Sequence, residues 1–138
     1  MNLRLSILAA TGGAILISAS AIAPAKSEHY DARAAGKLAK ALAGRAPGAP
    51  VSCIGNGRGS DMQVIDDNTI LFREGGTVYV QKPSGGCHGI GNGYSLVTRL
   101  HGSNRLCRGQ IGEVVDQVSG FSYSSCVFGD FIPYRKAS

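Results

Sequence analysis

Four cysteines constrain this chain of 138 residues more than any other feature: Cys53, Cys87, Cys107 and Cys126. Their successive spacings are 34, 20 and 19 residues. A zinc site needs close pairs such as Cys-x-x-Cys, which place two thiolates on one ion, and these spacings supply none. An even number of cysteines in a small exported chain favours disulfides. The pattern therefore predicts two disulfide bridges and no metal site or cofactor.

Four cysteines allow three pairings, and the spacing does not choose among them. Cys53 falls in the first expected strand and Cys126 in the last, so a bridge between them would tie the two ends of the folded domain. Cys87 would then pair with Cys107. This nested pairing is the one we favour, and the other two remain open.

The first 25 residues have the pattern of a secretory signal peptide. Arg4 is their only charged side chain, the apolar run of residues 5–16 follows, and small residues with Ala-x-Ala spacing come last. Cleavage is expected after Ala21 or Ala25. An uncleaved anchor is the alternative, since about 20 apolar residues can span a bilayer. The pattern favours a periplasmic or secreted protein, in a compartment where disulfides persist.

Residues 26–50 are expected to form a basic helical arm followed by a Pro/Gly linker. The composition of Ser27–Gly44 favours a helix, with Asp31 as its N-cap and Gly44 as its C-terminal stop. A helical wheel places Ala35, Leu38 and Leu42 on one side and three cations on the other: Arg33, Lys37 and Lys40. The cationic side could make weak contact with an anionic surface such as lipid headgroups. The interpretation that we favour is a helix that packs two leucines on the domain, or a partly frayed linker, because two leucines and some alanines bury too little area to hold a membrane alone.

The basic charge belongs mainly to this arm. Residues 26–45 contain five basic and two acidic side chains, whereas residues 46–138 contain eight and seven. Nucleic-acid affinity depends on many clustered phosphate contacts, so no nucleic-acid partner is expected. Because Pro47 and Pro50 follow the helix, the segment 46–50 is expected to separate the arm from the folded domain, which should fold without it.

Residues 51–138 are expected to form an all-β domain. The hydrophobic period changes to two, and glycine-rich turns separate short segments without a helical period between them. The segment 94–100 alternates, with Ser95, Val97 and Arg99 on one side. We expect a small antiparallel meander or partly open barrel of six or seven strands.

Several polar residues are candidate site residues. Asp66-Asp67-Asn68 reads as a tight turn more readily than as a carboxylate pair for acid–base chemistry. Glycine loops at 55–59 and 89–93 lack the spacing of a phosphate-binding loop. If these loops lie together, Arg58, His88 and Tyr94 form a possible binding surface. No nucleophile motif is present, so no catalytic residue is assigned.

The function expected from these features is an exported, non-catalytic binding or structural module of the cell envelope, whose partner is an envelope protein or a glycan. A small exported hydrolase, or a barrel of the OB type that stacks a glycan or nucleic acid, is the alternative. An enzyme should show a pocket with convergent titratable groups, whereas a binding module should show an apolar or aromatic patch. Five aromatic residues could supply such a patch: Tyr79, Tyr94, Phe121, Tyr123 and Tyr134.

A set of short motifs also resembles a known group of proteins. The motifs are Ser52-Cys53-Ile54, residues 64–72, Gly86-Cys87-x-Gly-Ile90, Arg105-Leu106-Cys107 and Gly129-x-Phe131-x-Pro133-Tyr134. Together they resemble an uncharacterised family of small exported bacterial proteins with four cysteines, over about residues 50–134. The resemblance implies a shared disulfide-stapled β fold and carries over no activity.

Overall fold

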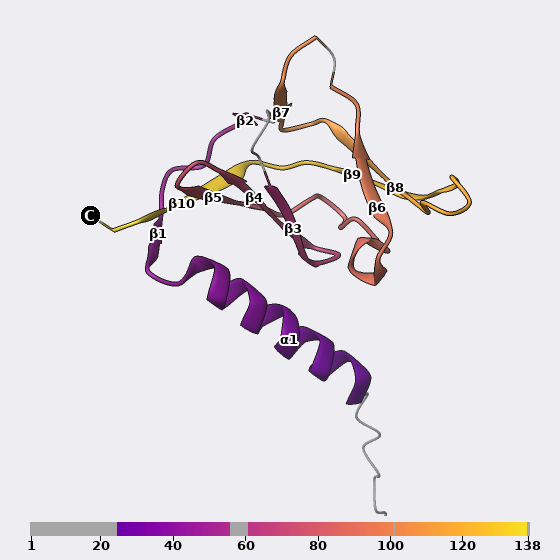
Figure 1. The fold of residues 1–138 in the computed structure, drawn as a ribbon, viewed down its shortest axis with the longest axis horizontal. Coiled ribbons are helices and arrows are strands. Elements are labelled where there is room, and N and C mark those ends of the chain that lie inside the picture. Colours follow the sequence, from indigo (N-terminus) through magenta and orange to yellow (C-terminus); the bar gives the residue numbers. More distant parts are fainter. Residues whose placement is uncertain (1–24, 56–60, 101, 138) are drawn as a thin grey trace, which may run out of the picture.

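The computed structural model describes residues 25–55, 61–100 and 102–137, and side chains from Tyr30 onward. Apart from Ala25, the expected signal peptide lies outside this part of the chain, and so does Arg58. None of the helices in the described ranges is both long and apolar enough to cross a membrane. The described elements, drawn in Figure 1, are α1 (Ala25–Leu42), β1 (Arg45–Pro47), β2 (Cys53–Gly55), β3 (Asp61–Asp66), β4 (Thr69–Glu74), β5 (Thr77–Gln81), the 3-10 turn η1 (Ile90–Asn92), β6 (Ser95–Thr98), β7 (Arg105–Cys107), β8 (Ile111–Val115), β9 (Ser122–Val127) and β10 (Phe131–Lys136).

The strands form three antiparallel sheets. Sheet A has the order β1-β10-β5-β4-β3, sheet B pairs β2 with β7, and sheet C has the order β6-β8-β9. The expected all-β antiparallel fold is confirmed, and β3, β4 and β5 form a meander of successive neighbours. The described residues contain more strands than expected, because β1 and β7 have only three residues each, too few to reveal a period of two in the sequence.

The first hydrophobic core lies between the sheets. Three phenylalanines form its centre: Phe72 meets Phe128 and Phe131 edge to face, with ring centroids 6.3 and 5.9 Å apart. Edge-to-face packing is a favourable geometry for aromatic rings. Ile54 of β2 and Leu106 of β7 reach into the same core, so the short sheet B is anchored by its buried side chains.

The second core lies on the other face of sheet A, which α1 covers (Figure 1). Ala34 is 6% exposed and packs with Ile65, Leu71, Val78 and Val80 of the sheet. Leu38, Ala41 and Leu42 continue this contact toward the end of the helix. The helix is therefore part of the core, contrary to the expectation of an arm separate from the folded domain.

Three details of the expected helix can be compared with α1. Ala34, not Ala35, faces the sheet, and Ala35 is exposed. Asp31 lies inside the helix instead of at its N-cap, since α1 begins at Ala25. Gly44 follows the helix with a φ of 68°, a left-handed conformation that suits glycine at the end of a helix, so the expected stop is confirmed.

The segment expected to be a linker is bonded to sheet A. Arg45–Pro47 pairs with β10 as the edge strand β1. The Gly48 amide then donates to the Pro133 carbonyl over 2.7 Å, and Val51 exchanges two backbone bonds of 2.9 Å with Phe131. Pro47 did not prevent this pairing, because an edge strand tolerates a proline whose missing N–H would face solvent.

Both expected disulfides are present, but the favoured nested pairing is wrong. Cys53 is joined to Cys107, and Cys87 to Cys126. The reason lies in strand pairing: β2 aligns with β7 so that Cys53 is directly opposite Cys107. The second bridge closes inside the first core, where Cys87 and Cys126 are 0% and 3% exposed.

Candidate functional site

The outer face of sheet C carries a row of exposed apolar side chains. In the sheet register Val97 of β6 is opposite Glu113 of β8, and Ile111 of β8 is opposite Val127 of β9. Directly paired residues share a face, and the alternate residues Val114 and Cys126 are turned into the core. The outer face is therefore left with Val97, Ile111 and Val127 in contact with solvent.

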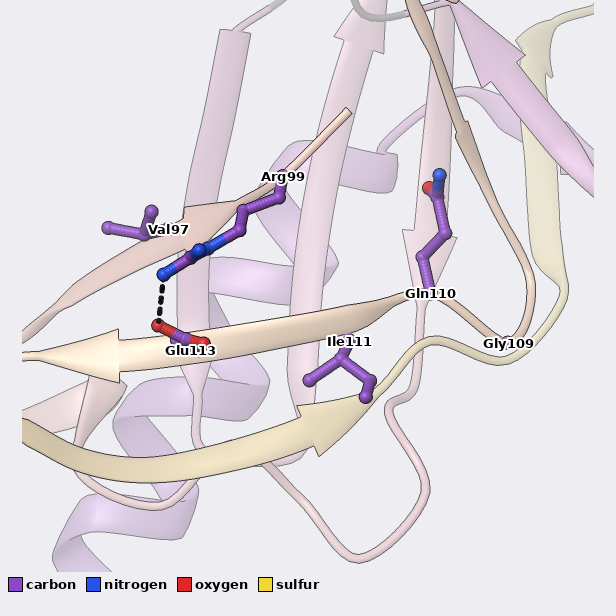
Figure 2. A pocket seen from close by; sticks show the side chains of 6 residues that line it. All are labelled: Val97, Arg99, Gly109, Gln110, Ile111 and Glu113. Carbon is purple, nitrogen blue, oxygen red and sulfur yellow. Dashed lines mark ion pairs between the residues drawn. The ribbon is translucent and has the colours of Figure 1, made fainter. Parts of the chain in front are cut away.

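A depression of about 570 Å³ lies on this face, lined by Val97, Arg99, Gly109, Gln110, Ile111 and Glu113. Figure 2 shows Arg99 turned toward Glu113. The Nη2 atom of Arg99 is 3.7 Å from the Oε2 atom of Glu113, and both side chains are solvated. An exposed pair of this kind contributes roughly 0–1 kcal/mol, so it leaves the two charges available to a partner.

The β8–β9 hairpin extends this surface away from the body of the molecule (Figure 1). Val118 and Phe121, at its turn, are 97% and 77% exposed, and Tyr123 is 60% exposed. The Asp116 carboxylate holds the turn, accepting bonds from the Val118 amide and the Ser119 hydroxyl, both over 2.9 Å. These bonds lower the pKa of Asp116, and the bond from the Val118 amide has the largest effect. The turn thus presents apolar side chains on an ordered backbone.

The exposed apolar side chains concentrate on this one sheet. Among the residues that the structure describes, eight large hydrophobic side chains are exposed, and six of them lie on sheet C or its hairpin. We call these six the sheet C apolar surface: Val97, Ile111, Val118, Phe121, Tyr123 and Val127. Scattered exposed hydrophobics are ordinary on a protein surface, whereas their concentration on one sheet and its hairpin points to an interaction site.

Two of the three residues expected to form a binding surface, His88 and Tyr94, flank the glycine loop at 89–93. Tyr94 is half-buried and stacks on Tyr123, with ring centroids 4.7 Å apart and an interplanar angle of 20°. Gly89 lies beneath both rings, where a Cβ would come within 2.8 Å of each, and its φ of 94° also favours glycine. His88 is exposed, with Nδ1 3.9 Å from Asp67 Oδ2.

The two glycine loops lie near opposite ends of β4. The Gly55 amide is 3.2 Å from the Glu74 carboxylate at the end of β4, whereas the Gly91 amide donates over 2.8 Å to Asp67, just before β4 begins. A strand of six residues spans about 20 Å. Gly55, at the start of the 55–59 loop, therefore lies far from His88 and Tyr94, and the expected meeting of the two loops is not seen among the described residues.

Asp66 and Asp67 accept hydrogen bonds from backbone amides, as the turn interpretation predicted. Asp66 Oδ1 accepts the Asn68 amide over 2.7 Å. Asp67 binds Gly91 through its side chain and accepts the Cys87 amide through its carbonyl over 2.6 Å. Tyr30 of α1 lies close to Gly91, and partial burial, followed by the nearby Asp67, raises its pKa. Asp67 thus links the β3–β4 turn to the glycine loop.

A serine, a histidine and an aspartate meet here without the geometry of a catalytic triad. The Ser124 hydroxyl donates to the backbone carbonyl of His88 over 2.6 Å, and not to its imidazole. The 3.9 Å separation of His88 from Asp67 is longer than a hydrogen bond. A nucleophile needs its hydroxyl within reach of the base. Within the described ranges no group of three or more potential metal ligands is found either.

The sequence pattern predicts no site at the aliphatic residues of sheet C, although it holds a signal for one of them. The alternation of the segment 94–100 placed Val97 between Ser95 and Arg99 on one side, which is an apolar residue on the polar face of a strand. Of the five candidate aromatic residues, Phe121 and Tyr123 are exposed, whereas Tyr79, Tyr94 and Tyr134 are half-buried.

Comparison of the chain with family models, with curated proteins and with solved structures found no match. The resemblance to a family of small exported four-cysteine proteins therefore stays an expectation from the motifs.

Proposed function

We propose that this protein is an exported, non-catalytic binding or structural module of the cell envelope that contacts a partner protein through the sheet C apolar surface. The observation that carries the proposal is the concentration of six of the eight exposed large hydrophobic side chains on this sheet and its hairpin. Burial of apolar area drives most protein–protein association, and aromatic residues are enriched at the centre of interfaces.

Two further observations support this proposal. The two disulfides fit an oxidising compartment, in which such bridges form and persist. The depression on sheet C combines one exposed ion pair with apolar walls, which is a docking surface for side chains more than a site for acid–base chemistry.

The test is partner capture with a matched surface control. Ile111→Lys/Val127→Lys places two charges on the centre of the apolar surface, and Met62→Lys places one at an exposed apolar position on β3 of sheet A. In chemical cross-linking of the producing cells' envelope, we expect the wild type and Met62→Lys to trap the same species. The double variant should trap at least tenfold less, with an unchanged melting temperature, because charge would enter the desolvated interface. Equal trapping by all three proteins would contradict the proposal.

A glycan is the second candidate partner, because the Tyr94–Tyr123 stack places an exposed aromatic side chain, that of Tyr123, at one end of the same sheet. The same experiment separates the two partners. A captured species that resists protease digestion and is lost in Tyr123→Ala, but kept in Ile111→Lys/Val127→Lys, would assign the ligand to the aromatic end instead of the apolar face.

We also propose weak contact of α1 with an anionic surface. Arg33, Lys37 and Lys40 are exposed, whereas Leu38 and Leu42 pack on sheet A and offer no side chain for insertion. At about 1 kcal/mol for each cation near the surface, three cations predict millimolar affinity.

Co-sedimentation with vesicles tests this contact. Binding is expected for vesicles rich in anionic lipid at low salt, and neutralising the three cations with Gln should reduce it to the level seen with neutral vesicles. Lys82→Gln, which removes an exposed cation from outside the helix, is the control and should bind as the wild type. Binding that persists at 1 M salt, where the Debye length is about 3 Å, would rule out an electrostatic contact.

A further inference from the structure

The two disulfides lie in different surroundings. Cys87 and Cys126 are buried in the first core, whereas Cys53 and Cys107 are half-buried on the small sheet B. Reduction of a disulfide requires a thiolate to reach one of its sulfurs, so access decides which bridge reacts. We propose that the Cys53–Cys107 bridge is a thiol–disulfide exchange site, which an external dithiol opens while Cys87–Cys126 stays closed and the protein stays folded.

The exchange is a two-step transfer of two electrons. A thiolate of the external dithiol attacks one sulfur of the bridge, which forms a mixed disulfide and releases the other cysteine as a thiolate. The second thiol of the reagent, after losing its proton, then displaces the bound cysteine. The products are two protonated cysteine thiols and an oxidised, disulfide-bonded reagent.

The local charge favours release of Cys107. Arg105 is two residues before Cys107 on β7, so their side chains lie on the same face of the strand, and Arg105 is exposed. A neighbouring cation stabilises a thiolate, and a better stabilised thiolate leaves faster. Arg108, on the other side of Cys107, is engaged with Asp130 over 3.2 Å. Arg105 is therefore the cation that we assign to this step.

Sheet B can loosen without disrupting the remaining fold. Its ladder has three residue pairs, and β2 and β7 pair only with each other. Two short strands alone are only marginally stable. Ile54 and Leu106 remain buried in the first core, which Cys87–Cys126 still crosslinks. Because Cys53 and Cys107 are directly opposite, with Cα atoms 4.0 Å apart, the two thiols stay adjacent and the bridge can form again.

The experiment is timed reduction of the oxidised full chain with dithiothreitol, quenched with iodoacetamide and followed by peptide mapping. Cys53 and Cys107 should be alkylated at least tenfold faster than Cys87 and Cys126. Circular dichroism should stay native after the first reduction, and hydrogen exchange should increase in β2 and β7 but not in β4 or β5. Simultaneous reduction of both bridges, earlier reduction of Cys87–Cys126, or unfolding at the first step would overturn the proposal.

Two sets of variants sharpen the result. In Cys53→Ala/Cys107→Ala the remaining bridge should be reduced as slowly as it is in the wild type, which excludes protection by the outer bridge as the cause of the rate difference. Arg105→Glu should slow opening of Cys53–Cys107 severalfold at an unchanged melting temperature, and Arg105→Lys should restore the rate. An unchanged rate in Arg105→Glu would overturn the role of Arg105.

Discussion

Replacing Ala34 and Leu38 with glutamate is expected to lower the melting temperature by at least 15 °C or to prevent folding. Both side chains face sheet A, where Ala34 is buried among Ile65, Leu71 and Val80. Loss of the buried contact costs about 1.5–3 kcal/mol for Leu38 and about 0.8 kcal/mol for the methyl group of Ala34, and two unpaired carboxylates next to that core add a desolvation cost. The sum is comparable with the whole stability of a small domain, about 5–15 kcal/mol.

The matched control is Ala35→Glu/Ala39→Glu. It introduces the same two charges four residues apart on the same helix, at positions that are exposed. Its melting temperature should stay within a few degrees of the wild type, since surface substitutions usually change stability by less than about 0.5 kcal/mol. Thermal unfolding followed by circular dichroism measures both variants. Equal melting temperatures for the two would mean that α1 does not cover sheet A in solution.

Removal of the buried bridge with Cys87→Ala/Cys126→Ala is expected to destabilise the protein more than removal of the outer bridge with Cys53→Ala/Cys107→Ala. The bridges span 39 and 54 residues, so in the chain-entropy model each contributes about 4 kcal/mol. The difference comes from packing. Truncating Cys87 and Cys126 leaves a cavity in the first core, which should add about 1–2 kcal/mol.

The packing around the buried bridge supports this difference. A Cβ built on Gly112 would come within 2.8 Å of Leu96, 3.2 Å of Phe128 and 3.4 Å of the Cys126 sulfur, so this part of the core has no spare volume. Thermal unfolding of both double variants gives the comparison. Each variant should contain no free thiol, and its intact mass checks that the remaining bridge has formed. A larger loss for the outer pair would show that chain constraint, and not core packing, dominates.

Features that depend on neighbouring residues could be predicted from the sequence. The change of hydrophobic period after residue 50 indicated strands, because alternate side chains of a strand face alternate sides wherever it lies. The turn at Asp66-Asp67-Asn68 and the helix end at Gly44 follow from short-range backbone chemistry. Four cysteines without close pairs indicated two disulfides.

Part of the candidate site was also accessible in this way. The sequence predicts Tyr94 as part of a possible binding surface, and in the structure its ring stacks on Tyr123, a contact between positions 29 residues apart. Val97, Ile111 and Val127 are apolar residues in alternating strands, so the sequence pattern alone does not distinguish them from core residues. Only the packing of sheet C shows which face is covered, and therefore which apolar side chains remain for a partner.

The features that only the tertiary structure decided all depend on contacts between distant parts of the chain. The bridge partners follow from β2 pairing with β7, which no local pattern encodes. Ala34 and Ala35 differ by one residue, or about 100° of helix rotation. Ala34 is the buried one because it packs against Leu71, Val78 and Val80 of sheet A. In the same way β1 is a strand because β10 offers it an edge, although Pro47 by itself favours a break. Local sequence sets which conformations are available, and the packing of remote segments selects among them.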